Sequence, residues 1–314
     1  MRYYDLKILD KNSLAVIREW GSYPGGIYDP GALNVEFDCF VYPQAQPKGG
    51  STISLEGIQL ADLTNAKAFT GQIVQLRAGM GPGLPLVSPA QRGLIVQGQV
   101  FQAYGNWVGT EMTLDLVVVA SPYTVTTPGN IVLNWRKGTP LSAALQNTLA
   151  VAYPKATLDI QISPIVQSFD EVGFYPTLIQ LAQTLSDITS TDLTIVAAGN
   201  KITVRDRTIK PQPLELVFTD FIGQPMWIDA NVIQLWTVMR ADISIGSILK
   251  MPQQMTNAPG FVQTTQAAYP SQLKYKAAMQ GQFVVQSVRF VGNLRAPDAR
   301  SWVTVINAAA MAND

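Results

Sequence analysis

Two stretches of the chain share the layout of a β-hairpin, and they constrain the fold more than any other feature. Gln97–Ala120 and Gln280–Ala309 both open on Gln-Gly-Gln and later reach a Gly-Asn pair. In each stretch, apolar residues then recur at every second position, the spacing of a half-buried strand. The interval from the first glycine to the Gly-Asn pair is seven residues in one stretch and eleven in the other, so a common origin requires an insertion.

The two stretches have different turn regions. In the first, Gly105-Asn106 is the expected turn, and the second strand runs through Met112, Leu114, Leu116 and Val118. In the second, Gly292-Asn293 precedes a strand in which Trp302, Thr304 and Ile306 alternate with Val303 and Val305. We expect the two stretches to occupy equivalent places in two superposable β domains.

Short strands separated by Gly and Pro fill the first part of the chain, up to about residue 135. The pattern is typical of a small barrel or sandwich. The expected strands before the first hairpin are Leu14–Trp20, Leu33–Pro43, Ser51–Ile58 and Gly71–Leu76.

A different pattern begins at Gly138. Thr139 can cap a helix with Pro140 at its first position, and Leu141, Leu145 and Leu149 recur every four residues until Pro154. A second helical stripe follows Tyr175-Pro176, at Leu178, Leu181, Ala182, Leu185 and Ile188. We expect a strand at Leu158–Ile162 and a hairpin over Gly199-Asn200, which makes this piece a small α+β domain.

The strand pattern returns at Leu214. Strands are expected at Leu214–Phe218, Ile233–Val238 and Ile243–Met251, and a long loop at Met251–Ser271. The resulting prediction is a mainly β chain of three domains: an N-terminal β domain at 1–137, a small α+β domain at 138–212 and a C-terminal β domain at 213–314.

Composition excludes several classes of function. The 314 residues include no histidine and a single cysteine, Cys39, which rules out Ser-His and Cys-His nucleophile pairs, zinc sites built from Cys and His, and intrachain disulfides. The 22 basic and 22 acidic residues balance, so no global field attracts nucleic acid or anionic lipid. No segment reaches the length of a membrane span, and we expect a soluble protein without a cleaved signal.

A few residues could carry chemistry, but each has a simpler explanation. Glu36 and Asp38 share one face of a strand, as the carboxylates of a glycosidase could, although solvated strand positions suffice. The glycines at 79, 81 and 83 are interrupted by Pro82 and Pro85 and lack a following Gly-Lys-Ser/Thr, which favours a loop between strands over a phosphate site. Cys39 lies on an apolar strand face and is expected to be buried and unreactive.

Charged clusters and tryptophans also favour structural explanations. Asp170-Glu171 and Arg205-Asp206-Arg207 are short clusters at element ends, where local ion pairing accounts for them. Tryptophans spread through strands usually pack in cores or interfaces, although they can stack on sugars or nucleobases; these are Trp107, Trp135, Trp227, Trp236 and Trp302. We therefore expect no catalytic, cofactor or metal site.

Several phrases of the chain resemble the baseplate hub proteins of contractile-tailed bacteriophages. They are QIVQLRAGM from Gln72, GTPLSAALQNTLAVAYP from Gly138, FTDFIGQPMWID from Phe218, MRADISIGSILKMP from Met239 and VRFVGNLRAPDARSWVTVINA from Val288. The resemblance implies two β domains with the fold of the tail tube protein and a smaller domain between them. In a homotrimer, two such domains per chain would form a ring of six similar units.

The resemblance also implies the partners and the location. The tail tube protein would lie above the ring and the central spike protein below it, with the tape measure protein and other baseplate proteins as further neighbours. DNA would meet this chain only in transit through the lumen, and the chain would not insert into a membrane. The ring would belong to the virion tail baseplate and would assemble in the cytoplasm of the host bacterium.

Other functions stay open at the level of sequence. A tail tube or distal tail protein is the structural alternative, and it would be distinguished by a hexamer in place of a trimer. A cell-wall hydrolase using Glu36 and Asp38, or a carbohydrate-binding tail adhesin using the tryptophans and the 251–271 loop, are alternatives from other classes.

Overall fold

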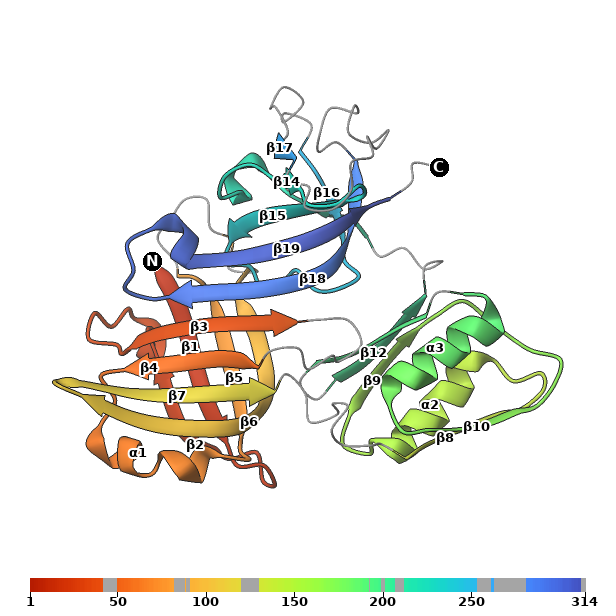
Figure 1. Ribbon diagram of the computed structural model, residues 1–314, viewed down its shortest axis with the longest axis horizontal. Helices are drawn as coiled ribbons and strands as arrows, with labels where there is room; N and C mark the ends of the chain where they lie inside the picture. Colours follow the sequence, from red (N-terminus) through yellow and green to blue (C-terminus); the bar gives the residue numbers. More distant parts are fainter. Residues whose placement is uncertain are drawn as a thin grey trace.

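The computed structural model describes residues 1–41, 50–81, 88, 91–119, 130–191, 193–198, 201–206, 212–252, 261–262 and 281–311. The chain is mainly β, as expected, with a large antiparallel sheet and a few helices. In Figure 1, the two β regions lie one above the other, and an α+β unit extends to the right.

Two sets of strands and one helical unit make up the described chain. The N-terminal set is β1 (Arg2–Leu9), β2 (Val16–Gly21), β3 (Asn34–Val41), β4 (Ser51–Glu56), β5 (Ile73–Met80), β6 (Gly93–Val108) and β7 (Glu111–Val119), with the short helix α1 (Leu60–Thr64). The C-terminal set is β13 (Leu214–Glu215), β14 (Met226–Trp227), β15 (Val232–Val238), β16 (Ile248–Lys250), β17 (Phe261–Val262), β18 (Gln282–Asn293) and β19 (Trp302–Ala310).

The two sets join in one sheet. Its strand order is β17-β14-β15-β19-β18-β3-β4-β7-β6-β5-β1-β2, and β13 and β16 pair beside β18. The junction is the antiparallel pair β18–β3, which runs from Val288 opposite Val41 to Asn293 opposite Glu36. One hydrophobic core contains residues of both sets, so the strands bury their apolar faces against each other rather than in two separate cores.

The two sets repeat one strand order. In the N-terminal set, β3, β4, β7, β6 and β5 are successive antiparallel neighbours; in the C-terminal set, β14, β15, β19, β18 and β16 are. The chain also visits the equivalent strands in the same order. One difference is that β1 runs antiparallel to β5, whereas β13 runs parallel to β16.

Both predicted hairpins form, as β6–β7 and β18–β19, and each contains a bulge at an equivalent place. The register of β6 shifts between Val100 and Gln102, and that of β18 between Val285 and Ser287. In each strand the shift comes just after the last residue paired with β5 or β16, whereas the pairing with β7 or β19 continues on both sides of it. That the two sets superpose remains a prediction.

The position of the first turn is a correction to the sequence analysis. Gly105-Asn106 lies inside β6 rather than in a turn, and the strand continues to Val108. Gly105 follows Gln102, the first paired residue after the bulge, by three positions, whereas Gly292 follows the corresponding Ser287 by five, so the two Gly-Asn pairs are not equivalent. Close packing explains both glycines, because a Cβ would lie 2.5 Å from the carbonyl oxygen of Leu63 at Gly105 and 2.2 Å from the ring of Phe37 at Gly292.

The α+β unit has its own core. It contains β8 (Ile131–Trp135), α2 (Leu141–Ala152), β9 (Thr157–Gln161), β10 (Glu171–Tyr175), α3 (Leu178–Thr189), β11 (Leu193–Ala198) and β12 (Lys201–Asp206). β8 precedes the expected boundary at residue 137, yet it pairs with β10 and packs against α2, because its alternating apolar residues Ile131, Leu133 and Trp135 face that helix.

The predicted helices form with small differences at their ends. α2 begins at Leu141, and Pro140, not Thr139, occupies the cap position in an extended conformation. The α3 helix is capped by Thr177, whose Oγ1 accepts a hydrogen bond from the amide of Gln180 at 3.2 Å. The stripes of both helices are buried in this second core, which fits their spacing.

Three expectations in the C-terminal set differ from the structure or fall outside it. Phe218 begins a 3₁₀ turn, Phe218–Asp220, instead of continuing a strand, because the Asp220 carboxylate accepts a hydrogen bond from the amide of Val217 and closes the turn. Of the strand expected at Ile243–Met251, only β16 forms. The long loop expected at Met251–Ser271 lies outside the described residues apart from Met251, Pro252 and β17.

Candidate assembly surface

The β18–β3 junction is held by charged and amide side chains on its exposed face. The guanidinium of Arg289 donates from Nε and Nη2 to the two carboxylate oxygens of Asp38, at 2.7 and 2.6 Å. Asn293 donates its side-chain amide to Glu36 at 3.3 Å. The carboxylates that the sequence marked as a possible catalytic pair thus bond across the junction, and this contact gives their shared strand face a structural explanation.

Trp302 anchors the same junction from the buried side. Its Nε1 donates to the carbonyl oxygen of Gly79 at 2.8 Å, and its ring meets that of Phe37 edge-on with centroids 5.2 Å apart. Arg2 lies over the ring, and its guanidinium donates to the carbonyl oxygens of Asn293 and Ala296. The first strand of the chain therefore holds the loop that follows β18 in place.

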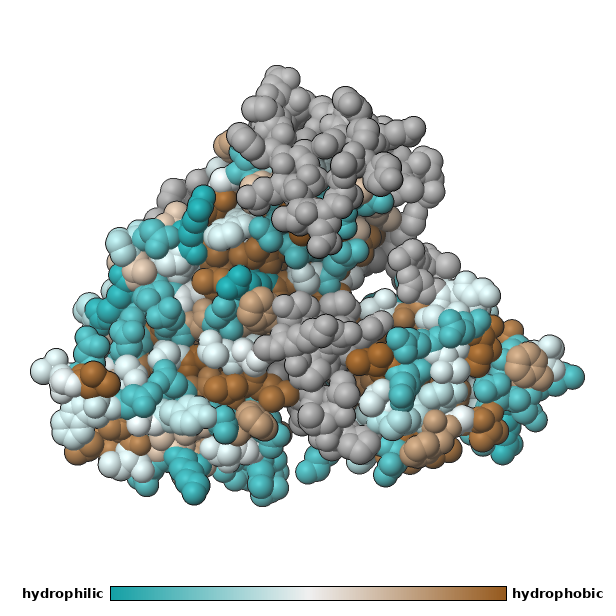
Figure 2. All heavy atoms as spheres, in the orientation of Figure 1, coloured by the Kyte–Doolittle hydropathy of each residue, from teal (hydrophilic) through white to brown (hydrophobic). Residues whose placement is uncertain are grey.

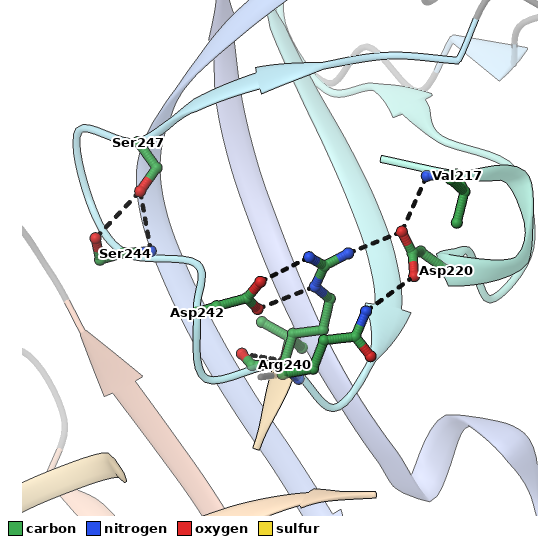
Figure 3. Close-up of polar contacts among 8 residues, drawn as sticks. Val217, Asp220, Arg240, Asp242, Ser244 and Ser247 are labelled. Atoms are coloured by element: carbon green, nitrogen blue, oxygen red, sulfur yellow. Dashed lines mark hydrogen bonds and ion pairs between the residues drawn. The ribbon is translucent and has the colours of Figure 1, made fainter. Parts of the chain in front are cut away.

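A buried ion cluster around Arg240 connects the two sets at a second point (Figure 3). Arg240, of which 4% is exposed, donates to Asp220 at 2.8 Å and to both oxygens of Asp242 at 3.0 and 2.7 Å. Gln91, from the N-terminal set, donates to Asp220, and its carbonyl oxygen accepts from the amide of Ala241 at 2.7 Å.

The two carboxylates set the ionisation of this guanidinium. Burial acts to lower the pKa of Arg240, but the hydrogen bonds to Asp242 and the charges of Asp242 and Asp220 raise that pKa above its usual value. The guanidinium therefore stays charged although it is buried. The cluster ties Asp220, Asp242 and Gln91 together from three separate segments, which indicates a structural role.

One edge of the sheet carries an exposed apolar strand segment. After the bulge, the part of β6 from Gln102 to Val108 pairs with β7 on one side only among the described strands. Trp107 is 62% exposed and Val108 76%, and Tyr104 and the bulge residue Phe101 are also exposed. Figure 2 shows hydrophobic side chains at the left tip, where Figure 1 places the end of this hairpin.

A second apolar surface lies on the α+β unit. In the two-stranded sheet β8–β10, Val132 pairs with Phe174. Both side chains and that of Val172 are exposed on the face away from the core. Two residues of the Arg205-Asp206-Arg207 cluster have local partners. Arg205 pairs with Asp159, which also pairs with Lys201, and Asp206 accepts hydrogen bonds from the amide and hydroxyl of Ser163.

The other candidates from the sequence are dispersed. Asp170 accepts a hydrogen bond from the amide of Lys137 at 2.7 Å, a local contact of the kind expected. Gly79 lies in β5 and Gly81 directly follows that strand, where a Cβ would lie 2.0 Å from the hydroxyl oxygen of Tyr23, so close packing accounts for Gly81. The rest of the proposed loop, 82–87, and Arg207 lie outside the described residues.

The five tryptophans considered from the sequence, out of six in the chain, do not form one platform. Trp135, Trp227 and Trp302 are buried, Trp236 is half-buried beneath Arg300, and only Trp107 is largely exposed. Cys39 is fully buried, as predicted, and burial raises the pKa of its thiol, which makes a reactive thiolate unfavourable.

The exposed β6 edge was the surface that sequence reasoning missed. Its signal was available, since Phe101, Tyr104, Trp107 and Val108 place apolar side chains on both faces of one strand. Within the described ranges, no group of three or more Asp, Glu, Cys or His side chains could hold a metal ion. None of the helices in the part of the chain that the structure describes is long and apolar enough to cross a membrane.

The fold has known structural relatives. The chain is similar to the 43 kDa tail protein of prophage MuSo2 from Shewanella oneidensis, with a TM-score of 0.52 and 8% identity, over 99% of this chain and 97% of that one. It is also similar to the c3393 protein of E. coli, with a TM-score of 0.50 and 8% identity, over 90% of this chain and 74% of that one.

The second relative is described as a component of the type VI secretion system with structural similarity to the T4 bacteriophage tail proteins gp27 and gp5. No family model matches the chain, and no curated protein matches it. The resemblance to phage tail proteins inferred from the sequence is thus confirmed as a likeness of fold over nearly the whole chain.

Proposed function

We propose that this chain is the structural baseplate hub of a phage tail, a non-enzymatic homotrimeric ring that joins the tail tube to the central spike. Two similar β units per chain give such a ring six similar positions, which fit a sixfold tube above while the ring keeps threefold symmetry below. The opening on the axis is the channel for DNA, and the ring takes its place in the virion tail.

The observation that carries this proposal is the repeated strand order. The series β3-β4-β7-β6-β5 recurs as β14-β15-β19-β18-β16, with the bulge at the same step. A duplicated unit within one chain is the economical way to present six similar surfaces from three subunits. The full-length likeness to a phage tail protein supports the same conclusion.

The domain division belongs to this proposal. The N-terminal β unit at 1–137 and the C-terminal unit at 213–314 are the ring-forming units, and 138–212 is the smaller unit outside the ring, to which β8 adds its strand. The tail tube protein, the spike protein, the tape measure protein and other baseplate proteins are the proposed partners.

Mass measurement of the purified protein tests the ring. We expect a particle of three chains of 34.1 kDa each. A hexamer would instead favour a tail tube or distal tail protein, the runner-up function. Imaging of tails assembled with a labelled chain should place the label on the tail axis, and a label at the periphery would favour a carbohydrate-binding adhesin.

The hydrolase alternative has a separate test. Because Glu36 and Asp38 are bonded to Asn293 and Arg289, neither carboxylate is available as a free acid or base. We expect the wild-type protein to clear no bacterial cell-wall suspension. Clearing that is lost on Glu36→Gln or Asp38→Asn would establish the hydrolase and contradict the hub.

A further inference from the structure

The exposed edge of β6 has unpaired backbone groups that face away from the sheet. The carbonyl oxygen of Met112 in β7 accepts a hydrogen bond from the amide of Gly57, which lies beyond β4, so the backbone polar groups of Met112 point away from β6. In an antiparallel ladder, the residue opposite then also points its N–H and C=O away from the pair. The residue opposite Met112 is Trp107. The backbone groups of Gly105 and Ala103 also point away from β7, because the direction repeats at every second residue of a strand.

This edge is long and apolar, and although Leu63 of α1 packs against Gly105, no described strand other than β7 pairs with it. Among the described residues, no backbone group outside β7 bonds to the main chain of 102–108. Exposed strand edges with apolar side chains pair with other chains unless they are blocked by charge, proline or a covering element. The segment 102–108 contains no charged residue and no proline.

The C-terminal set shows what covers the equivalent edge. Counting from the bulge, Trp107 corresponds to Gly292, because each follows the first paired residue after the bulge, Gln102 or Ser287, by five positions. The strand segment 288–293 is paired on its outer side by β3 of the same chain. The strand that corresponds to β3 in the repeated order is β14, and within the described part of the chain β14 does not pair with β6.

We propose that the 102–108 edge of β6 pairs with the β14 edge of a second copy of this chain, and that this contact repeats the β18–β3 junction between subunits. The proposal rests on the proposed ring. Each copy has one edge of each kind, so the contact is head-to-tail and closes when three copies meet. Among the described residues, only the two of β17 pair with the outer side of β14, and the incoming strand displaces them.

The register follows from the intrachain junction. Asp38 lies opposite Val291 in β3–β18, and the same steps along β14 and β6 place Met226 opposite Asn106. Because the polar groups of Asn106 point toward β7, this cross-subunit pair is of the non-hydrogen-bonded kind, whose Cα atoms lie close enough for a disulfide.

A pair of variants with equal exposure tests the surface. Trp107→Lys places a charge on the β6 edge, and Phe174→Lys places one on the β8–β10 face; both wild-type side chains are 62% exposed. In sedimentation across a concentration series, we expect Trp107→Lys to weaken trimer formation at least tenfold and Phe174→Lys to leave it unchanged. Equal effects of the two variants would overturn the assignment.

A cysteine pair tests the partner strand. Under mild oxidation, the double variant Asn106→Cys and Met226→Cys should give covalent species of up to three chains, and neither single variant should pass two. Native Cys39 is fully buried and does not compete.

The outcomes separate the edge from the ring. A wild-type trimer that survives Trp107→Lys and forms no cross-link would overturn the β6–β14 pairing and leave the ring intact. Weakening by Trp107→Lys without cross-linking would exclude β14 as the partner. A wild-type protein that stays a single chain, or forms a hexamer, would overturn the ring and this pairing together.

Discussion

Arg289 and Asp38 are 251 positions apart in the sequence, yet their side chains form a two-point ion pair across the only strand pair that joins the two described β sets of this sheet. The side chains are 45% and 35% exposed, so water and salt screen the pair. The ion pair therefore marks the β18–β3 junction, whereas backbone pairing and the shared core supply most of the stability there.

A double-mutant cycle on this pair should give a small coupling. We expect Asp38→Asn and Arg289→Gln to show a coupling free energy of about 0.5–1 kcal/mol in denaturant unfolding, as exposed ion pairs do. The coupling should shrink in 1 M salt, where the Debye length is about 3 Å. A coupling that salt leaves unchanged would show that the pair is more deeply buried than its exposure indicates.

Removal of Asp220 should be far more costly. Asp220→Ala leaves the buried guanidinium of Arg240 with Asp242 as its remaining carboxylate, and we expect a loss of about 3–5 kcal/mol in the free energy of unfolding. Glu215→Ala is the control, because its partner Lys250 and Glu215 are both exposed, and no measurable change is expected. Similar losses in the two variants would contradict a structural role for the cluster.

Gly292→Ala should strain the junction directly. The added Cβ would lie 2.2 Å from the buried ring of Phe37, and overpacking of this kind costs about 1–3 kcal/mol. Phe37→Leu in the same chain removes the ring and should recover part of the loss in thermal or denaturant unfolding. If the second substitution restores nothing, the strain does not arise from this contact.

Asp159 should make the stability depend on acid. Hydrogen bonds from Arg205 and then Lys201 lower the pKa of Asp159 from 3.8 to about 2. A carboxylate whose pKa is depressed in the folded state stabilises the fold at any pH above its pKa in the unfolded state. That contribution is lost as the pH falls from 3.8 toward 2. Asp159→Asn should therefore flatten the fall in unfolding free energy over this window, and an unchanged slope would show that other groups cause it.

Local patterns predicted most of the elements. The stripes of α2 and α3, the strand alternation of β3 and β7 and the burial of Cys39 follow from side-chain periodicity, which reflects which face of an element meets the core. The half-buried alternation expected for β19 was wrong, because Trp302 to Ile306 are all buried. The same reasoning failed for Gly105, where identity with Gly292 suggested a turn. The contact with Leu63, which lies outside the hairpin, explains that glycine instead.

The candidate surface was harder to predict than the elements. Glu36 and Asp38 were recognised as neighbours on one strand face, but their partners Asn293 and Arg289 are distant in sequence and follow only from the pairing of β3 with β18. The Arg240 cluster likewise brings together Gln91, Asp220 and Asp242, and no local spacing relates Gln91 to the other two.

The sequence by itself determined the mainly β character, the two related hairpins, the helical unit between them and the absence of histidine chemistry, because each depends on composition or on neighbours a few residues apart. Only the tertiary structure decided that the two β sets share one sheet and one core, that the shared register begins at the bulges and not at the Gly-Asn pairs, and that β6 ends in an open edge. Those features depend on which strands lie beside each other, and strand pairing over hundreds of residues leaves no local pattern in the chain.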